Sequence, residues 1–135
     1  TMRDFVRFAE ALRAGGILDG KRILSPKTIN YMTMNHLPAV LRGGFNGEPE
    51  KYPLLLRHPG VGYGLGFAMI QDLPANFALG SVGQYYWAGA AGTMFWIDPV
   101  EDIVIVSMMQ LINPWFPYRR DVRNATYQAI TESKE

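Results

Sequence analysis

The serine and histidine side chains could carry nucleophilic or metal chemistry, but they lack the neighbours that such chemistry requires. Ser81 and Ser107 fall in predicted strands, and neither has a sequence neighbour typical of a general base. We interpret both as structural hydroxyls. His36 and His58 have no carboxylate at ligand spacing, which indicates loop or cleft-edge histidines. The sequence has no cysteine, which excludes disulfides and thiolate chemistry. We expect neither a metal nor a cofactor.

Two glycine-containing segments are candidate ligand-binding sites. Gly62-x-Gly64-x-Gly66 departs from the dinucleotide-binding fingerprint, because its third glycine comes one place early and a strand follows instead of a helix. Trp87 and Gly89 lie at the end of a predicted strand, where a glycine allows a ligand to approach the backbone closely. Trp87 has the alternative interpretation of a core aromatic residue.

Helical patterns dominate the first 35 residues. Apolar residues at helical spacing predict a helix over residues 1–14, with Thr1 as its N-cap and Asp4 completing a capping box. Asp19-Gly20 predicts a tight turn, and Ser25-Pro26 has the residue types that begin a helix. Residues 36–60 are rich in proline and glycine, and we expect an irregular loop that forms one wall of a cleft.

The remaining sequence predicts an antiparallel sheet and a final helix. Four strands are expected between residues 62 and 110, over 62–71, 77–87, 92–98 and 102–110. A helix over residues 117–133 follows, with its arginines in solvent, including Arg119, Arg120 and Arg123. The order of elements predicts an α+β fold in which helices flank an antiparallel sheet.

The last predicted strand needs cover on both of its faces. Residues 103–109 are apolar on both faces, as in strands covered from two sides. A single C-terminal helix cannot cover both faces of a sheet, and the N-terminal helices can cover part of the second face. Because the strand is apolar on both faces, we still expect a partner segment that this sequence does not supply.

Composition and charge exclude several classes of protein. The net charge is +1 and no basic stripe is present, so a nucleic-acid partner is not expected. Arg119-Arg120 is too short a basic cluster for a phosphate clamp. No segment is apolar and long enough to span a membrane, and residues 1–15 do not resemble a signal peptide. Localisation stays open between bacterial cytoplasm and periplasm.

An ordered series of motifs resembles the C-terminal region of the serine β-lactamase-like family, in the carboxylesterase and transesterase branch related to class C β-lactamases. The motifs are residues 15–28, 34–38, 62–67, 87–93 and 95–99. The resemblance implies that residues 1–135 form a single partial domain, the C-terminal portion of a β-lactamase/transpeptidase-like fold.

The resemblance also implies a set of site residues. The family uses a Ser-x-x-Lys nucleophile and a Tyr-x-Asn base motif, and neither pattern occurs here. Trp87-Ala88-Gly89 takes the place of the family's Lys-Thr-Gly motif and resembles a Trp-Gly-Gly variant, from which Ala88 departs by a methyl group. These three residues would bind substrate, and the backbone N–H of Ala90 would supply half of an oxyanion hole.

The function implied is that of a serine esterase acting on small carboxylic esters through an acyl-enzyme. Without the nucleophile, this chain alone is predicted to be inactive. Its expected partner is the missing N-terminal portion of the same domain, in the same chain or a second one. Because Trp87 lacks the lysine cation, we expect β-lactams to be handled poorly. The alternatives are a non-catalytic module or one chain of an assembly, and a β-lactamase or D-alanyl peptidase relative.

Overall fold

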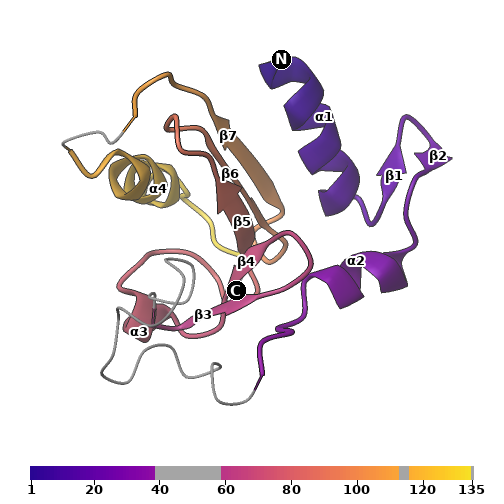
Figure 1. The fold of residues 1–135 in the computed structure, drawn as a ribbon, viewed down its shortest axis with the longest axis horizontal. Coiled ribbons are helices and arrows are strands. Elements are labelled where there is room, and N and C mark those ends of the chain that lie inside the picture. The colour runs from indigo at the N-terminus through magenta and orange to yellow at the C-terminus, as the bar shows by residue number, and fades with distance from the viewer. Residues whose placement is uncertain (39–58, 113–115, 135) are drawn as a thin grey trace.

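The computed structural model describes residues 1–38, 59–112 and 116–134 (Figure 1). In chain order, the elements found there are α1 (Met2–Arg13), β1 (Ile17–Leu18), β2 (Lys21–Arg22), α2 (Pro26–Met32), β3 (Val61–Tyr63), β4 (Ala68–Ile70), α3 (Leu73–Asn76), β5 (Tyr85–Ala88), β6 (Met94–Asp98), β7 (Ile103–Ser107) and α4 (Tyr118–Gln128). Strands β3 to β7 form one sheet in sequence order, and every neighbouring pair is antiparallel. The predicted α+β class is confirmed.

The helices α1 and α4 cover opposite faces of this sheet (Figure 1). Side chains alternate between the two faces along a strand. On β6, Phe95 contacts Phe5 of α1 with ring centroids 5.0 Å apart. Its neighbour Trp96 faces α4, whose Arg123 guanidinium lies 5.8 Å from the Trp96 ring centroid. The larger core cluster lies on the α1 face, where Ala9 and Leu12 are buried.

The two N-terminal helices begin where the sequence predicts. Thr1 and Asp4 form the capping box of α1, and the helix ends at Arg13 before two glycines. The Ser25 hydroxyl accepts a hydrogen bond from the Thr28 N–H at 3.0 Å, and Pro26 opens α2. Between the helices, Asp19 and Gly20 both have positive φ and join β1 to β2, as a two-residue hairpin turn requires.

The single strand predicted over residues 62–71 is wrong. The chain forms a hairpin there, with β3 paired to β4 from Val61↔Ile70 to Tyr63↔Ala68. Two glycines explain the reversal. A Cβ at Gly64 would lie 2.0 Å from the Met32 carbonyl oxygen, and Gly66 has a φ of +89°. The hairpin tip therefore depends on a contact with α2 that residues 62–71 alone do not reveal.

The strand predicted over residues 77–87 begins only at Tyr85. Before it, Asp72 caps the short helix α3, and Phe77 ends that helix in the left-handed conformation. Gly80 and Gly83 also have positive φ, which is incompatible with a regular strand. The next two strands lie within the predicted ranges, but the final helix ends at Gln128 instead of Ser133. Beyond it, Ser133 and Lys134 hydrogen-bond to Glu101.

Strand β7 forms one edge of the described sheet. It pairs with β6 along its whole length, from Ile103↔Asp98 to Ser107↔Met94, and all five residues are half-buried. Among the described residues no other strand pairs with it. The loop predicted over residues 36–60 falls mainly on 39–58, outside the described residues, and His58 lies there. In the described part of the chain, no helix has the length and apolar character needed to cross a membrane.

Candidate functional site

The candidate site lies where β5 extends past its neighbour β4. Strand β5 pairs with β4 only at Tyr85 and Tyr86, but it pairs with β6 as far as Ala88. Beyond Tyr86, the β4 side of the strand has no partner strand among the described residues. An unpaired strand edge offers backbone donors and acceptors to a ligand. Trp87 and Ala88 occupy this free end.

A tight turn follows the strand and positions Ala90. The Gly89 N–H donates to the Thr93 carbonyl at 2.8 Å, and the Gly92 N–H donates to the Gly89 carbonyl at 3.2 Å. A Cβ at Gly89 would lie 2.4 Å from the Thr93 hydroxyl oxygen, and Gly92 has a φ of +87°. Gly89 thus leaves room for the Thr93 side chain, and Gly92 supplies a backbone conformation that other residues rarely adopt.

The Ala90 N–H is free within this turn. Ala90 is exposed, and its amide donates no hydrogen bond to any residue that the structure describes. Sheet pairing therefore does not occupy the donor that the resemblance assigns to an oxyanion hole. Its catalytic role stays a prediction, as do the substrate contacts of Trp87, Ala88 and Gly89.

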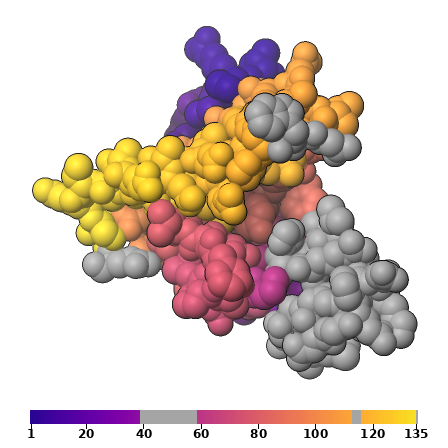
Figure 2. Space-filling view, turned by 90° about the vertical axis from the view of Figure 1, so that its left-hand side faces the viewer, coloured from indigo at the N-terminus to yellow at the C-terminus, as the bar shows by residue number. Residues whose placement is uncertain are grey.

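A cavity lies on each side of this strand end. The cavity on the α1 side has a volume of about 300 Å³, and Phe5, Thr93 and Val106 contribute to its lining. The cavity on the α4 side has a volume of about 560 Å³, and Phe77 and Tyr86 contribute to its wall. In Figure 2, α4 lies across this second face, above the segment around α3. Residues 87–89 line both cavities.

Trp87 combines core packing with a position at the site. Its ring meets Tyr63 edge-on, with centroids 5.5 Å apart, and it packs against both core clusters. Trp87 is therefore a core aromatic residue and also lies at the candidate site, so the two interpretations of the sequence do not exclude each other. Part of the ring fixes the strand end, and part of it borders the cavities.

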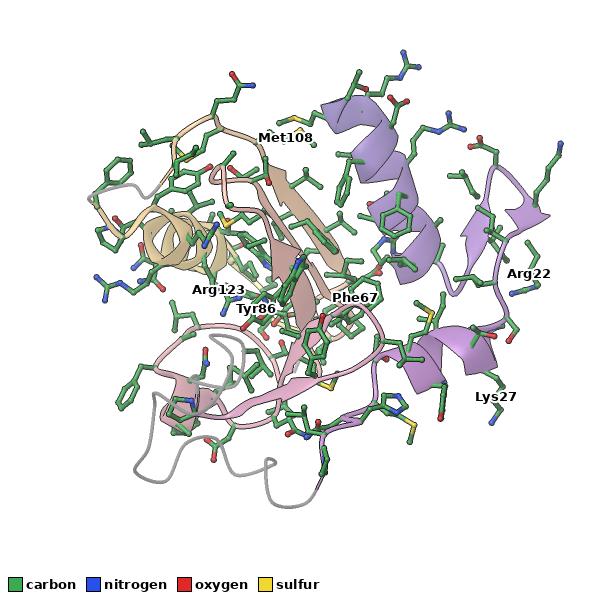
Figure 3. All side chains as sticks on the ribbon, viewed as in Figure 1. Arg22, Lys27, Phe67, Tyr86, Met108 and Arg123 are labelled. Atoms are coloured by element: carbon green, nitrogen blue, oxygen red, sulfur yellow. The ribbon has the colours of Figure 1, made fainter. Side chains whose placement is uncertain are left out.

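Two arginines of α4 also belong to this region, although the sequence pattern placed them in solvent. Arg119 is exposed, and its Nη2 donates to the Gly89 carbonyl at 2.5 Å. Arg123 is half-buried, and its guanidinium lies 5.1 Å from the Tyr86 ring centroid. Figure 3 shows the Arg123 and Tyr86 side chains beside each other. For Arg123 the prediction was wrong, because stacking on two aromatic rings offsets the cost of burying the cation.

Burial controls the protonation of groups near the site. Loss of water contact raises the pKa of Tyr85 to about 12. Burial also raises the pKa of Tyr86, against the opposing influence of the Arg123 charge. Burial lowers the pKa of Arg123, opposed mainly by Tyr86 and Tyr127. Both tyrosines of β5 are therefore neutral at pH 7 and cannot serve there as tyrosinate bases.

The serines and the described histidine have other surroundings. The Ser107 hydroxyl hydrogen-bonds to the Tyr118 hydroxyl, which links β7 to α4. Ser81 is 1% exposed. The His36 Nε2 lies 2.7 Å from the Tyr31 carbonyl. In the described ranges, no three histidine or carboxylate side chains gather as a metal site would require.

Comparison with known proteins gives relatives much longer than this chain. No family model matches the sequence. Two curated proteins of Mycobacterium tuberculosis, the uncharacterized protein MT1414 of strain CDC 1551 and the protein Rv1367c of strain H37Rv, are each 32% identical to it over 115 residues. The matches cover 82% of this chain but only 27% of each relative.

Solved structures define the fold. The chain matches EstCE1, a hydrolase with promiscuous acyltransferase activity, with a TM-score of 0.71 and 24% identity over 94% of this chain and 29% of that one. It matches simvastatin synthase (LovD) from Aspergillus terreus with a TM-score of 0.66 and 18% identity, over 95% and 33% of the two chains.

A third match is a penicillin-binding protein homologue from Caulobacter crescentus, with a TM-score of 0.62 and 23% identity. That match covers 91% of this chain and 30% of the other. The fold is therefore that of the C-terminal portion of a serine β-lactamase/transpeptidase-like protein.

Proposed function

We propose that this chain forms part of a serine hydrolase that cleaves small carboxylic esters through an acyl-enzyme. The observation that carries the proposal is the free Ala90 N–H, which follows the unpaired end of β5 beside two cavities. Such a donor can stabilise the oxyanion of a tetrahedral intermediate. The likeness to EstCE1 and LovD supports this function at the level of the fold.

The attacking hydroxyl comes from a polypeptide segment outside these 135 residues. Each serine lacks a lysine three places later, so a Ser-x-x-Lys segment must be supplied by the same protein or by a partner chain. In the proposed reaction, that serine attacks the ester carbonyl and the alcohol leaves. Water or a second alcohol then attacks the acyl-serine and releases the acyl group. The Ala90 N–H binds the carbonyl oxygen as negative charge develops on it.

The edge strand β7 supports a docking place for the missing portion. Its outer side has no partner strand among the described residues, and its side chains from Ile103 to Val106 are apolar on both faces. Phe8 of α1 and Met108, which follows β7, are exposed by 45% and 39%. A further strand added to this edge would use the backbone groups of β7 and cover its half-buried side chains.

The substitution Ala90→Pro tests the role of the amide in the protein that contains this chain and its nucleophile. Proline removes the N–H, and no hydrogen bond to a described residue is lost. We expect kcat for p-nitrophenyl butyrate to fall by about 100- to 1000-fold, as for other lost oxyanion donors. Ala90→Ser keeps the N–H and is the matched control. An Ala90→Pro enzyme that folds and retains the wild-type kcat would contradict the proposal.

A further inference from the structure

We infer that Arg119 is a positioning residue that holds the Gly89–Ala90 peptide in the orientation needed for oxyanion binding. The inference rests on the proposed function and identifies a residue of the same site. It starts from one contact, the hydrogen bond of 2.5 Å from Arg119 Nη2 to the Gly89 carbonyl oxygen. That carbonyl and the Ala90 N–H belong to the same peptide unit.

Peptide geometry links the two groups. The Gly89–Ala90 peptide is planar and trans, like the other peptide bonds of the described chain. In a trans peptide the C=O and N–H bonds point in opposite directions. Because Arg119 belongs to the first turn of α4, it draws the Gly89 carbonyl towards that helix. The Ala90 N–H is thereby directed away from the Arg119 guanidinium.

The contact also strengthens the donor. A guanidinium bound to a carbonyl oxygen withdraws electron density from the peptide, and hydrogen bonds in series polarise one another. The Gly92 N–H bonds to the same oxygen at 3.2 Å. Gly92 belongs to the same turn as Gly89, whereas Arg119 binds the Gly89 carbonyl from outside the turn. Arg119 does not need to touch the substrate in order to act.

The charge and the geometry can be separated by substitution. Arg119→Met removes both the cation and the hydrogen bond, whereas Arg119→Lys keeps a cation with a single compact donor. Arg120→Met is the matched control, because Arg120 is the next residue of α4 and its side chain forms no hydrogen bond or ion pair with a described residue. All variants are made in the protein that carries this chain together with its nucleophile.

The first readout is kinetic. An oxyanion forms only during reaction, so a weakened donor lowers kcat and leaves substrate binding nearly unchanged. For Arg119→Met we expect kcat for p-nitrophenyl butyrate to fall about tenfold, while KM stays within about twofold. Arg119→Lys should recover part of the loss, and Arg120→Met should match the wild type. A change in KM alone, or equal effects of the two methionine variants, would refute the positioning role.

The second readout does not depend on activity. Gly89-Ala90 is the one Gly-Ala step in this sequence, so labelling glycine with ¹³C at the carbonyl and alanine with ¹⁵N reports on this peptide among the 135 residues. Arg119→Met should shift both the Gly89 carbonyl carbon and the Ala90 amide signals, and Arg120→Met should leave them in place. Unchanged signals in Arg119→Met overturn the inference. Shifted signals in a protein without esterase activity support the peptide anchor and count against the proposed function.

Discussion

At the residue scale, Trp87 both packs in the core and lines the candidate site. Its ring supports the strand end through Tyr63, and the same ring borders both cavities. At this position, by resemblance, the family's penicillin-recognising members have a lysine, which can bind a substrate carboxylate. An aromatic side chain provides no charge for that purpose. We therefore expect the proposed enzyme to prefer neutral ester substrates.

The substitution Trp87→Lys tests this specificity in the active protein. We expect labelled penicillin to acylate the variant faster relative to p-nitrophenyl butyrate turnover, because the new ammonium pairs with the penicillin carboxylate. Trp87→Phe keeps an aromatic ring without a charge and controls for the loss of packing. A ratio of penicillin acylation to ester turnover that is equal in both variants would refute the explanation.

At the scale of the elements, the turn between β6 and β7 joins α1 to the C-terminal segment. Asp102 forms ion pairs with Arg13 at the end of α1 and with Lys134. The hydrogen bond from Arg13 is the main reason that the pKa of Asp102 lies below its ordinary value of 3.8. Asp102 also has a φ of +58°, a conformation that asparagine adopts readily.

Asp102→Asn should therefore destabilise the protein in a pH-dependent way. A carboxylate whose pKa is lowered by folding stabilises the native state at pH values above its unfolded pKa, and this stabilisation is lost as pH falls through the folded pKa. We expect the variant to unfold at lower denaturant concentration at pH 7 and to match the wild type well below pH 3.8. Glu132→Gln serves as the control for charge. A difference that persists unchanged at low pH would contradict this account.

The elements also show what the sequence could predict. Helix starts depend on local signals, so Thr1 with Asp4 and Ser25 with Pro26 located α1 and α2 correctly. The hairpin at Gly64 depends on the distant Met32 carbonyl, and no pattern within residues 62–71 reveals it.

Contacts between residues distant in sequence also limited the prediction of the candidate site. The motif at residues 87–89 indicated the strand end, and the structure places it between two cavities. Arg119 was missed because its acceptor, the Gly89 carbonyl, lies 30 residues earlier in the chain. The one local signal, Pro117 before a helical pattern, indicates where α4 begins but not which arginine reaches the sheet.

At the scale of the molecule, the chain is a fraction of each relative found. It spans 27% of the curated proteins and between 29% and 33% of the matched structures. Strand β7 forms one edge of the sheet, and its residues are only half-buried by the described part of the chain. Both facts are compatible with the proposal that the site is divided between this chain and a second polypeptide portion.

Complementation tests that division. The 135-residue chain alone should not hydrolyse p-nitrophenyl butyrate, because the proposed nucleophile is outside it. Mixing or co-expressing it with the portion that carries Ser-x-x-Lys should restore turnover. The same mixture with that serine changed to alanine is the control for assembly without chemistry. Ester turnover by the chain alone, at a rate independent of the added portion, would disprove the assignment of the nucleophile.

Helix α4 has no fully buried residue, and polar side chains supply several of its contacts with the sheet. An element with so little buried apolar surface opens locally at a lower free-energy cost than the core strands do. Each opening would break the bond between Arg119 and Gly89 while β5 and β6 remain paired. If the proposed function holds, the fraction of molecules with a correctly held Ala90 amide follows the docking equilibrium of α4. Solvent conditions that loosen this helix would then reduce esterase activity before the sheet unfolds.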